Sequence, residues 1–139
     1  MRSISLLILS FLLSTGLLAA SDKNYVAQRL TGRLQIDGRL NETQWKAAAL
    51  ADSFLQNEPV QNAQITQRTV VRLLYDDQAV YVGAMMYDSA PDSILQQLGD
   101  RDKFFALNAD QFRIGFDPYN KRIDGYVFEL SASGIQGES

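Results

Sequence analysis

The sequence contains no cysteine and no histidine, and it has only one tryptophan and three prolines among 139 residues. Without cysteine, no disulfide braces the fold and no lipid can be attached to a cysteine at the amino terminus. Without histidine, Ser–His and Cys–His catalytic arrangements are excluded, as is a zinc site built from Cys and His ligands. The chemistry left to this chain is that of carboxylates, amides, hydroxyls, arginine, lysine and aromatic rings.

An excess of positive charge is also lacking, because the formal net charge is −3 at pH 7. A nucleic-acid-binding protein needs a basic face, so the charge argues against a nucleic-acid partner. The same mild acidity argues against docking on anionic lipid. With 46% hydrophobic residues, the chain has the material for a globular core.

The first twenty residues have the three parts of a secretory signal peptide. Arg2 supplies a basic start, residues 4–18 are apolar and uncharged, and Ala19 and Ala20 are the small residues expected at a cleavage site. A membrane-spanning helix wants about 20 apolar residues, and this run is shorter. We therefore predict cleavage near Ala20 and export to the periplasm, the outer membrane or the extracellular space.

Residues 21–139 have a suitable length for one domain, and two β-hairpins are predicted in it. The runs 69–75 and 79–87 are apolar and joined by three polar residues, and the second run is expected to be central or covered on both faces. The runs 112–116 and 126–130 alternate apolar and polar residues and form the second pair. One or two short strands are expected within residues 25–36.

Short helices complete the prediction. Asn41 is expected to cap a helix reaching Ala49, with Gln44 at the third helical position and Trp45 and Ala48 facing the core. Residues 92–98 are expected to form one or two helical turns, and the polar ending after Gly134 is expected to form no strand. The fold class is therefore all-β, an antiparallel β-sandwich of the jelly-roll kind with one or two short helices. Because a sandwich usually has more strands than these, the domain is expected to be incomplete at its C-terminal end.

Acidic residues suggest two further chemistries. Asp117, Asn120 and Asp124 share one turn and offer the oxygen ligands that calcium prefers, although Asp and Asn are also ordinary turn formers. They do not match the spaced calcium-binding loop. A pair of carboxylates could hydrolyse glycosides, but no pair stands out in the sequence.

Aromatic residues in loops are candidates for stacking on sugar rings, whose C–H faces are apolar. Phe104, Phe105 and Tyr119 lie in predicted loops, whereas aromatics in strands are more often core. Arg101 can donate charge-assisted hydrogen bonds to sugar hydroxyls, or form a surface ion pair with Asp102. The predicted ligand-binding residues are thus Arg101, Phe104, Phe105 and Tyr119.

Two motifs carry a resemblance to a known family. IDGRLNETQW at residues 36–45 resembles the IDG-x-L-(D/N)-E-x-x-W opening of carbohydrate-binding modules of family 9 and their relatives, and YDDQAVYVG at residues 75–83 resembles their central hairpin. Further matches follow in the expected order: Arg101-Asp102, Asp110, Phe116-Asp117, residues 125–129 and residues 134–137. The resemblance covers residues 28–137.

The resemblance implies a β-sandwich that binds carbohydrate and is carried by exported bacterial enzymes of polysaccharide breakdown. In one similar group, such a module precedes a region resembling an outer-membrane barrel. We therefore predict a non-catalytic carbohydrate-binding module, with no cofactor other than calcium. Two alternatives stay open at this point: a structural or interaction domain of an outer-membrane protein without a sugar site, and the front part of a glycoside hydrolase.

Overall fold

The computed structural model describes residues 23–139, apart from the side chain of Phe105, so the predicted signal peptide lies outside the described residues. Within that range, no helix has the length and apolar character needed to cross a membrane. The elements in chain order are β1 (Gln28–Arg29), α1 (Thr43–Ala47), β2 (Thr69–Tyr75), β3 (Val80–Met86), η1 (Pro91–Ser93), η2 (Phe104–Ala106), β4 (Gln111–Phe116), β5 (Tyr126–Ser131) and β6 (Gln136–Glu138).

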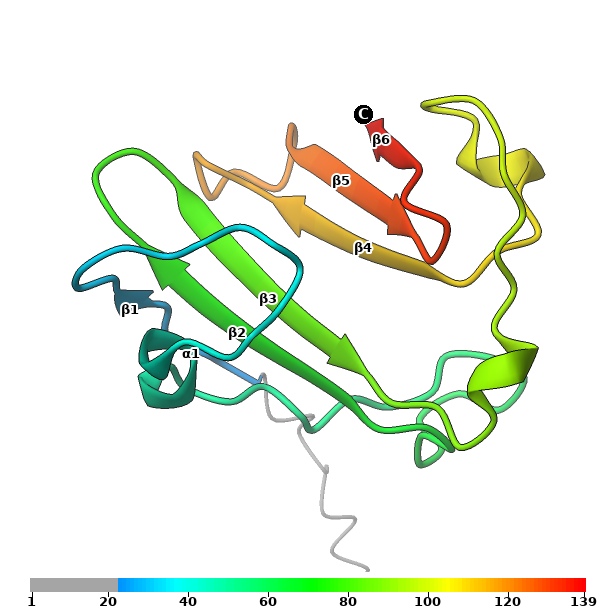
Figure 1. Ribbon diagram of the computed structural model, residues 1–139. Helices are drawn as coiled ribbons and strands as arrows, with labels where there is room; N and C mark the ends of the chain where they lie inside the picture. Colours follow the sequence, from blue (N-terminus) through cyan, green and yellow to red (C-terminus); the bar gives the residue numbers. More distant parts are fainter. Residues whose placement is uncertain (1–22) are drawn as a thin grey trace, which may run out of the picture.

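These strands form two three-stranded sheets, in the orders β1-β2-β3 and β4-β5-β6 (Figure 1). All pairs are antiparallel except β1 with β2, which are parallel. Both predicted hairpins are confirmed, with β2 paired to β3 and β4 paired to β5. The described chain is therefore rich in strand and poor in helix, as the alternating apolar runs predicted.

The first hairpin is closed by Asp76. Its carboxylate accepts hydrogen bonds from the backbone N–H groups of Gln78 and Ala79 and from the hydroxyl of Tyr81. These donors lower the pKa of Asp76, the N–H of Gln78 most, because they stabilise the ionised carboxylate. The Asp-Asp-Gln turn thus fixes the register of β2 on β3.

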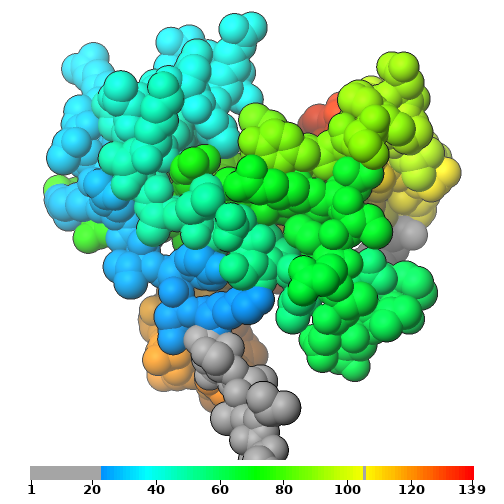
Figure 2. Space-filling view, turned by 90° about the horizontal axis from the view of Figure 1, so that it is seen from below, coloured from blue at the N-terminus to red at the C-terminus, as the bar shows by residue number. Residues whose placement is uncertain are grey.

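The core lies on one face of the first sheet. Trp45 is 4% exposed and packs with Ala48 and Leu74, as predicted for the tryptophan and the alanine. Leu30, Leu34, Leu40 and Tyr81 surround this cluster. Residues 23–66 carry most of these contacts, and they form much of the surface seen from below in the space-filling view (Figure 2).

Gly83 allows the tryptophan to approach β3. A Cβ at this position would lie 2.9 Å from Leu40 Cδ2 and 2.9 Å from Trp45 Cζ3, which is closer than packed atoms allow. The hydrogen atom of glycine is therefore what lets the indole ring pack against the strand.

The helix is shorter than predicted, and its cap is different. Glu42 rather than Asn41 is the N-cap, and no side chain caps the helix. Glu42 Oε1 accepts the N–H of Gln35, while the Gln44 amide donates to the carbonyl of Thr31. Both polar side chains tie the preceding loop to the helix, so a local capping signal was overridden by contacts across the loop.

Several other predictions are wrong in detail. β3 is an edge strand of its sheet, and β2 is the central one. Residues 92–98 contribute only to the 3-10 turn η1, and the polar ending forms β6, whereas residues 25–36 do contain one short strand, β1, as predicted. β6 pairs with β5, and Gly137, which has no side chain, lets Phe104 cover the new strand.

Candidate functional site

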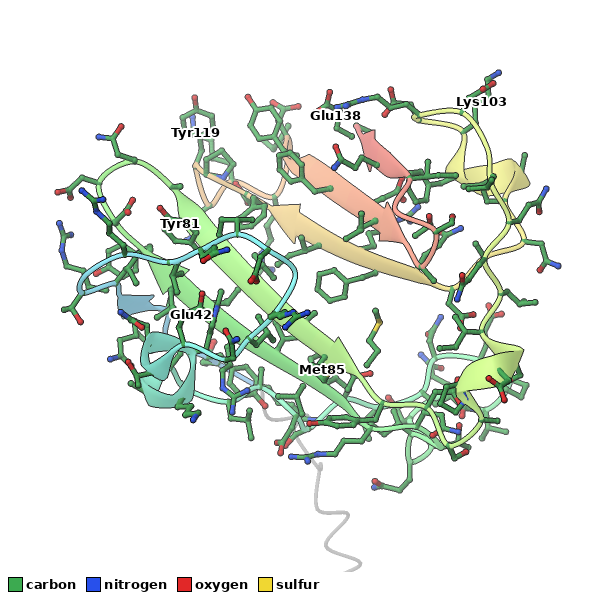
Figure 3. All side chains as sticks on the ribbon, viewed as in Figure 1. Glu42, Tyr81, Met85, Lys103, Tyr119 and Glu138 are labelled. Carbon is green, nitrogen blue, oxygen red and sulfur yellow. The ribbon has the colours of Figure 1, made fainter. Side chains whose placement is uncertain are left out.

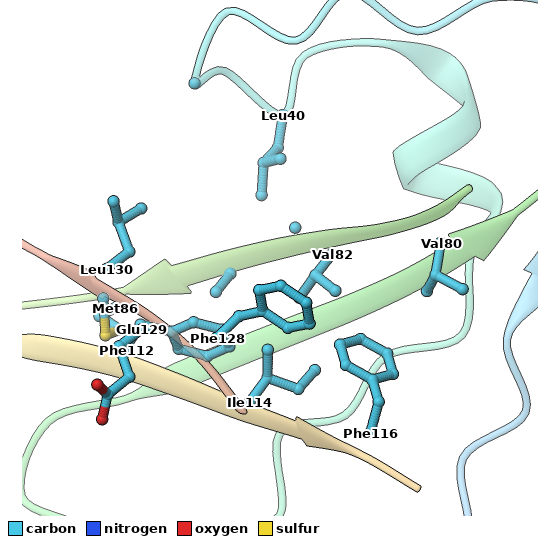
Figure 4. A pocket seen from close by; sticks show the side chains of 13 residues that line it. Leu40, Val80, Val82, Met86, Phe112, Ile114, Phe116, Phe128, Glu129 and Leu130 are labelled. Carbon is cyan, nitrogen blue, oxygen red and sulfur yellow. The ribbon is translucent and has the colours of Figure 1, made fainter. Parts of the chain in front are cut away.

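An open apolar cleft separates the two sheets. Its volume is about 520 Å³, and apolar side chains of β3 line one wall while those of β4 and β5 line the other (Figure 4). The apolar lining is Leu40, Val80, Val82, Ala84, Met86, Phe112, Ile114, Phe116, Phe128 and Leu130. Phe116 and Phe128 meet edge to face, with ring centroids 5.9 Å apart. The alternating apolar residues of the second hairpin therefore share one face, and that face looks into a cleft rather than a closed core.

A second hollow, of about 370 Å³, lies at the β4–β5 turn. The turn is built around Asp117, whose carboxylate accepts the backbone N–H groups of Tyr119, Lys121 and Arg122. These bonds, the one from Arg122 first, hold the pKa of Asp117 below its ordinary value. Asn120 and Arg122 have positive φ angles of 51° and 54° within this turn.

This geometry bears on the predicted calcium ligands. The Asp117 oxygens already face several N–H donors, which is the arrangement of a turn-forming aspartate rather than of a cation ligand. Within the part of the chain that the structure describes, no group of three or more Asp or Glu side chains converges in a way that could hold a metal ion. Asp117 is therefore a turn-forming residue, and the assignment of Asp117, Asn120 and Asp124 as calcium ligands stays a prediction.

Two tyrosines are exposed on the same hairpin. Tyr119 is 70% exposed at the turn, and Tyr126, at the start of β5, is 59% exposed and lines the hollow. The ammonium of Lys121 lies 5.7 Å from the centroid of the Tyr119 ring. Arg122 and Asp124 are exposed beside them and supply polar groups to the wall of the hollow. Aromatic rings next to hydrogen-bonding side chains thus gather at this turn.

The four predicted ligand-binding residues do not all lie at the β4–β5 turn. Arg101 pairs with Glu138, with 3.0 Å between Nη2 and Oε1, and lies 3.7 Å from Asp102, so it is the surface ion pair considered above. The prediction that Phe104 is an exposed loop aromatic is wrong, because its ring is 3% exposed and packs on Gly137. The side chain of Phe105 lies outside what the structure describes.

Only Tyr119 of the four is exposed at the hairpin. It lies at the β4–β5 end of the second sheet, whereas Lys103, next to Phe104, lies at the other end (Figure 3). The sequence does not single out Tyr126, because aromatic residues in strands are usually part of the core. Its position at the first residue of β5, directly after Gly125, is the signal that could have singled it out.

Comparisons of the chain with protein-family models, with curated proteins and with solved structures gave no match.

Proposed function

We propose that the domain is a non-catalytic carbohydrate-binding module of an exported bacterial protein, and that the β4–β5 turn holds the sugar. The observation that supports this most is the pair of exposed tyrosines, Tyr119 and Tyr126, on one hairpin beside Arg122 and Asp124. An aromatic ring covers the apolar face of a sugar, and charged side chains bond its hydroxyls. The motif resemblance to family 9 modules and the signal-like residues 1–20 point in the same direction.

The proposal includes the architecture. Two small sheets with their apolar faces toward one cleft are consistent with a β-sandwich, in which the apolar inner faces of two sheets face each other. The jelly-roll form of this fold would place the β4–β5 turn at one rim, where loops are free to bind. Export would deliver such a module to polysaccharide outside the cytoplasm.

Calorimetry with soluble oligosaccharides of cellulose, xylan and chitin tests the proposal on residues 21–139. We expect heat of binding with at least one of them, and a loss of affinity of tenfold or more for Tyr119→Ala and for Tyr126→Ala. Tyr87→Ala is the matched control, because Tyr87 is 50% exposed and also has a cation, that of Arg68, 5.6 Å from its ring centroid.

No heat with any sugar would contradict the proposal and favour an interaction domain without a sugar site. Equal losses for the hairpin variants and the Tyr87 control would show that the hairpin is not the binding place. The hydrolase alternative is tested in the same samples, because release of reducing ends would reveal cleavage.

A further inference from the structure

The free edge of β3 lies at the mouth of the apolar cleft. Asp76 N–H bonds to the carbonyl of Ala79, and Tyr87 N–H bonds to that of Arg68, so the hydrogen-bonded pairs of this ladder fall at every second residue. By that alternation Tyr81, Gly83 and Met85 bond to β2. The backbone N–H and C=O groups of Val82 and Ala84 therefore point away from β2, toward the edge.

These outward groups have no partner strand within residues 23–139. β3 pairs only with β2, and no backbone hydrogen bond of the described chain reaches Val82 or Ala84 from the other side. The edge also lacks the usual protection, because residues 80–86 contain no charge and no proline. It is a seven-residue apolar strand that is open to pairing.

The same residues present apolar side chains to the cleft. Val82 and Ala84 line it, together with Val80 and Met86, which are 51% and 49% exposed. Across the cleft lie Phe128 and Leu130 of β5, about half exposed. Glu129, the one charged residue at the cleft wall, is paired with Arg113 and is therefore neutralised. An uncharged cleft disfavours a charged occupant, because burying an unpaired charge is expensive.

We propose that the β3 edge takes an extended β-strand from a partner polypeptide, with an uncharged apolar side chain at every second position. Such a strand would bond to the outward groups of Val82 and Ala84 and fill the cleft with its alternate side chains. A lipid chain would fill the cleft but leave those backbone groups unpaired. A second copy could also pair its β3 with this β3 about a two-fold axis. The β4–β6 sheets of both copies would then lie on the same face of the combined sheet, where they would compete for the same space.

Amide hydrogen exchange on residues 21–139 tests this inference, with a capped peptide as the probe. The peptide is Lys-Thr-Val-Thr-Val-Thr-Val-Thr-Lys, and the control has the same composition without alternation, Lys-Val-Val-Val-Thr-Thr-Thr-Thr-Lys. We expect the alternating peptide to slow exchange at Val82 and Ala84 at least tenfold, with little change at Gly83, which is already bonded to β2. The control peptide should leave all three unchanged.

Two variants make the result specific. Ala84→Pro removes an outward N–H without removing a bond to β2, so it should fold and abolish protection at Val82, whereas Ala84→Val keeps the N–H and should retain protection. If Ala84→Pro fails to fold, Val82→Lys places a charge in the cleft and should have the same effect. Absence of protection, equal protection by both peptides, protection by dodecanoate alone, or peptide-independent protection that rises with protein concentration would each overturn the inference.

Discussion

At the scale of single residues, glycine positions determine how closely the layers approach. Gly83 lies under Trp45, and Gly137 lies under Phe104, where a Cβ would come within 2.4 Å of the ring. Each glycine allows a strand to be covered by an aromatic ring. The largest buried rings of the described chain are therefore positioned by residues that have no side chain.

Replacement of Gly83 by alanine tests this packing. We expect Gly83→Ala to lower the free energy of unfolding by about 1–3 kcal/mol, because Leu40 and Trp45 must shift to admit the methyl group. Urea unfolding followed by Trp45 fluorescence measures the change. Gly38→Ala is not a neutral control, because its φ of 79° strains any side chain, whereas Ala84→Val adds volume at an open position of the same strand. A Gly83→Ala variant as stable as the wild type would contradict the packing.

Two aspartates give the stability a predictable dependence on pH. The pKa of Asp76 and that of Asp117 are lowered in the folded protein, chiefly by backbone N–H donors from Gln78 and Arg122. A lowered folded pKa stabilises the protein above the unfolded pKa of about 3.9, and this stabilisation is lost as the pH falls through the folded value. We therefore expect the folded state to weaken progressively below about pH 4.

The variants Asp76→Asn and Asp117→Asn should reduce that acid sensitivity, since an amide still accepts hydrogen bonds but does not titrate in this range. Urea midpoints of each variant and the wild type, measured between pH 7 and pH 3, give the comparison. Asp92→Asn, on an exposed aspartate in η1, serves as the control. Unchanged pH dependence in both turn variants would show that these bonds do not contribute to folding.

At the scale of elements, the hairpins were predictable and the helix ends were not. Alternation in FRIGF and YVFEL and the Asp-Asp-Gln turn are local signals, so β2 to β5 could be located from the sequence. The N-cap depends on Gln35 and Thr31, which approach the helix only through the folded loop. β6 likewise depends on pairing with β5, and three residues with a central glycine carry little strand signal of their own.

The candidate site was predicted only in part, for a related reason. Tyr119 could be chosen because it lies in a turn rich in Asp, Asn and Lys. Phe104 lies in an equally polar stretch, but β6 returns beside it and its ring packs on Gly137. Whether an aromatic residue in a loop is exposed therefore depends on segments that are distant in the sequence, and the local sequence pattern does not contain that information.

At the scale of the whole molecule, the two sheets share one apolar cleft, and each sheet has a different exposed feature. The β4–β5 turn carries the exposed tyrosines, and the β3 edge carries unpaired backbone groups. A sugar site at the turn and a strand site at the edge would be separate surfaces. Binding at one is expected to leave the other available, so the two proposals can fail independently.

An NMR titration of the ¹⁵N-labelled domain with a short oligosaccharide tests most directly whether the β4–β5 turn binds carbohydrate. We expect the amide chemical shifts of residues 117–126 to change and to reach saturation, and we expect Tyr119→Ala to remove the change. Shift changes confined to another surface, or none with cellulose, xylan and chitin fragments, would contradict binding at this turn.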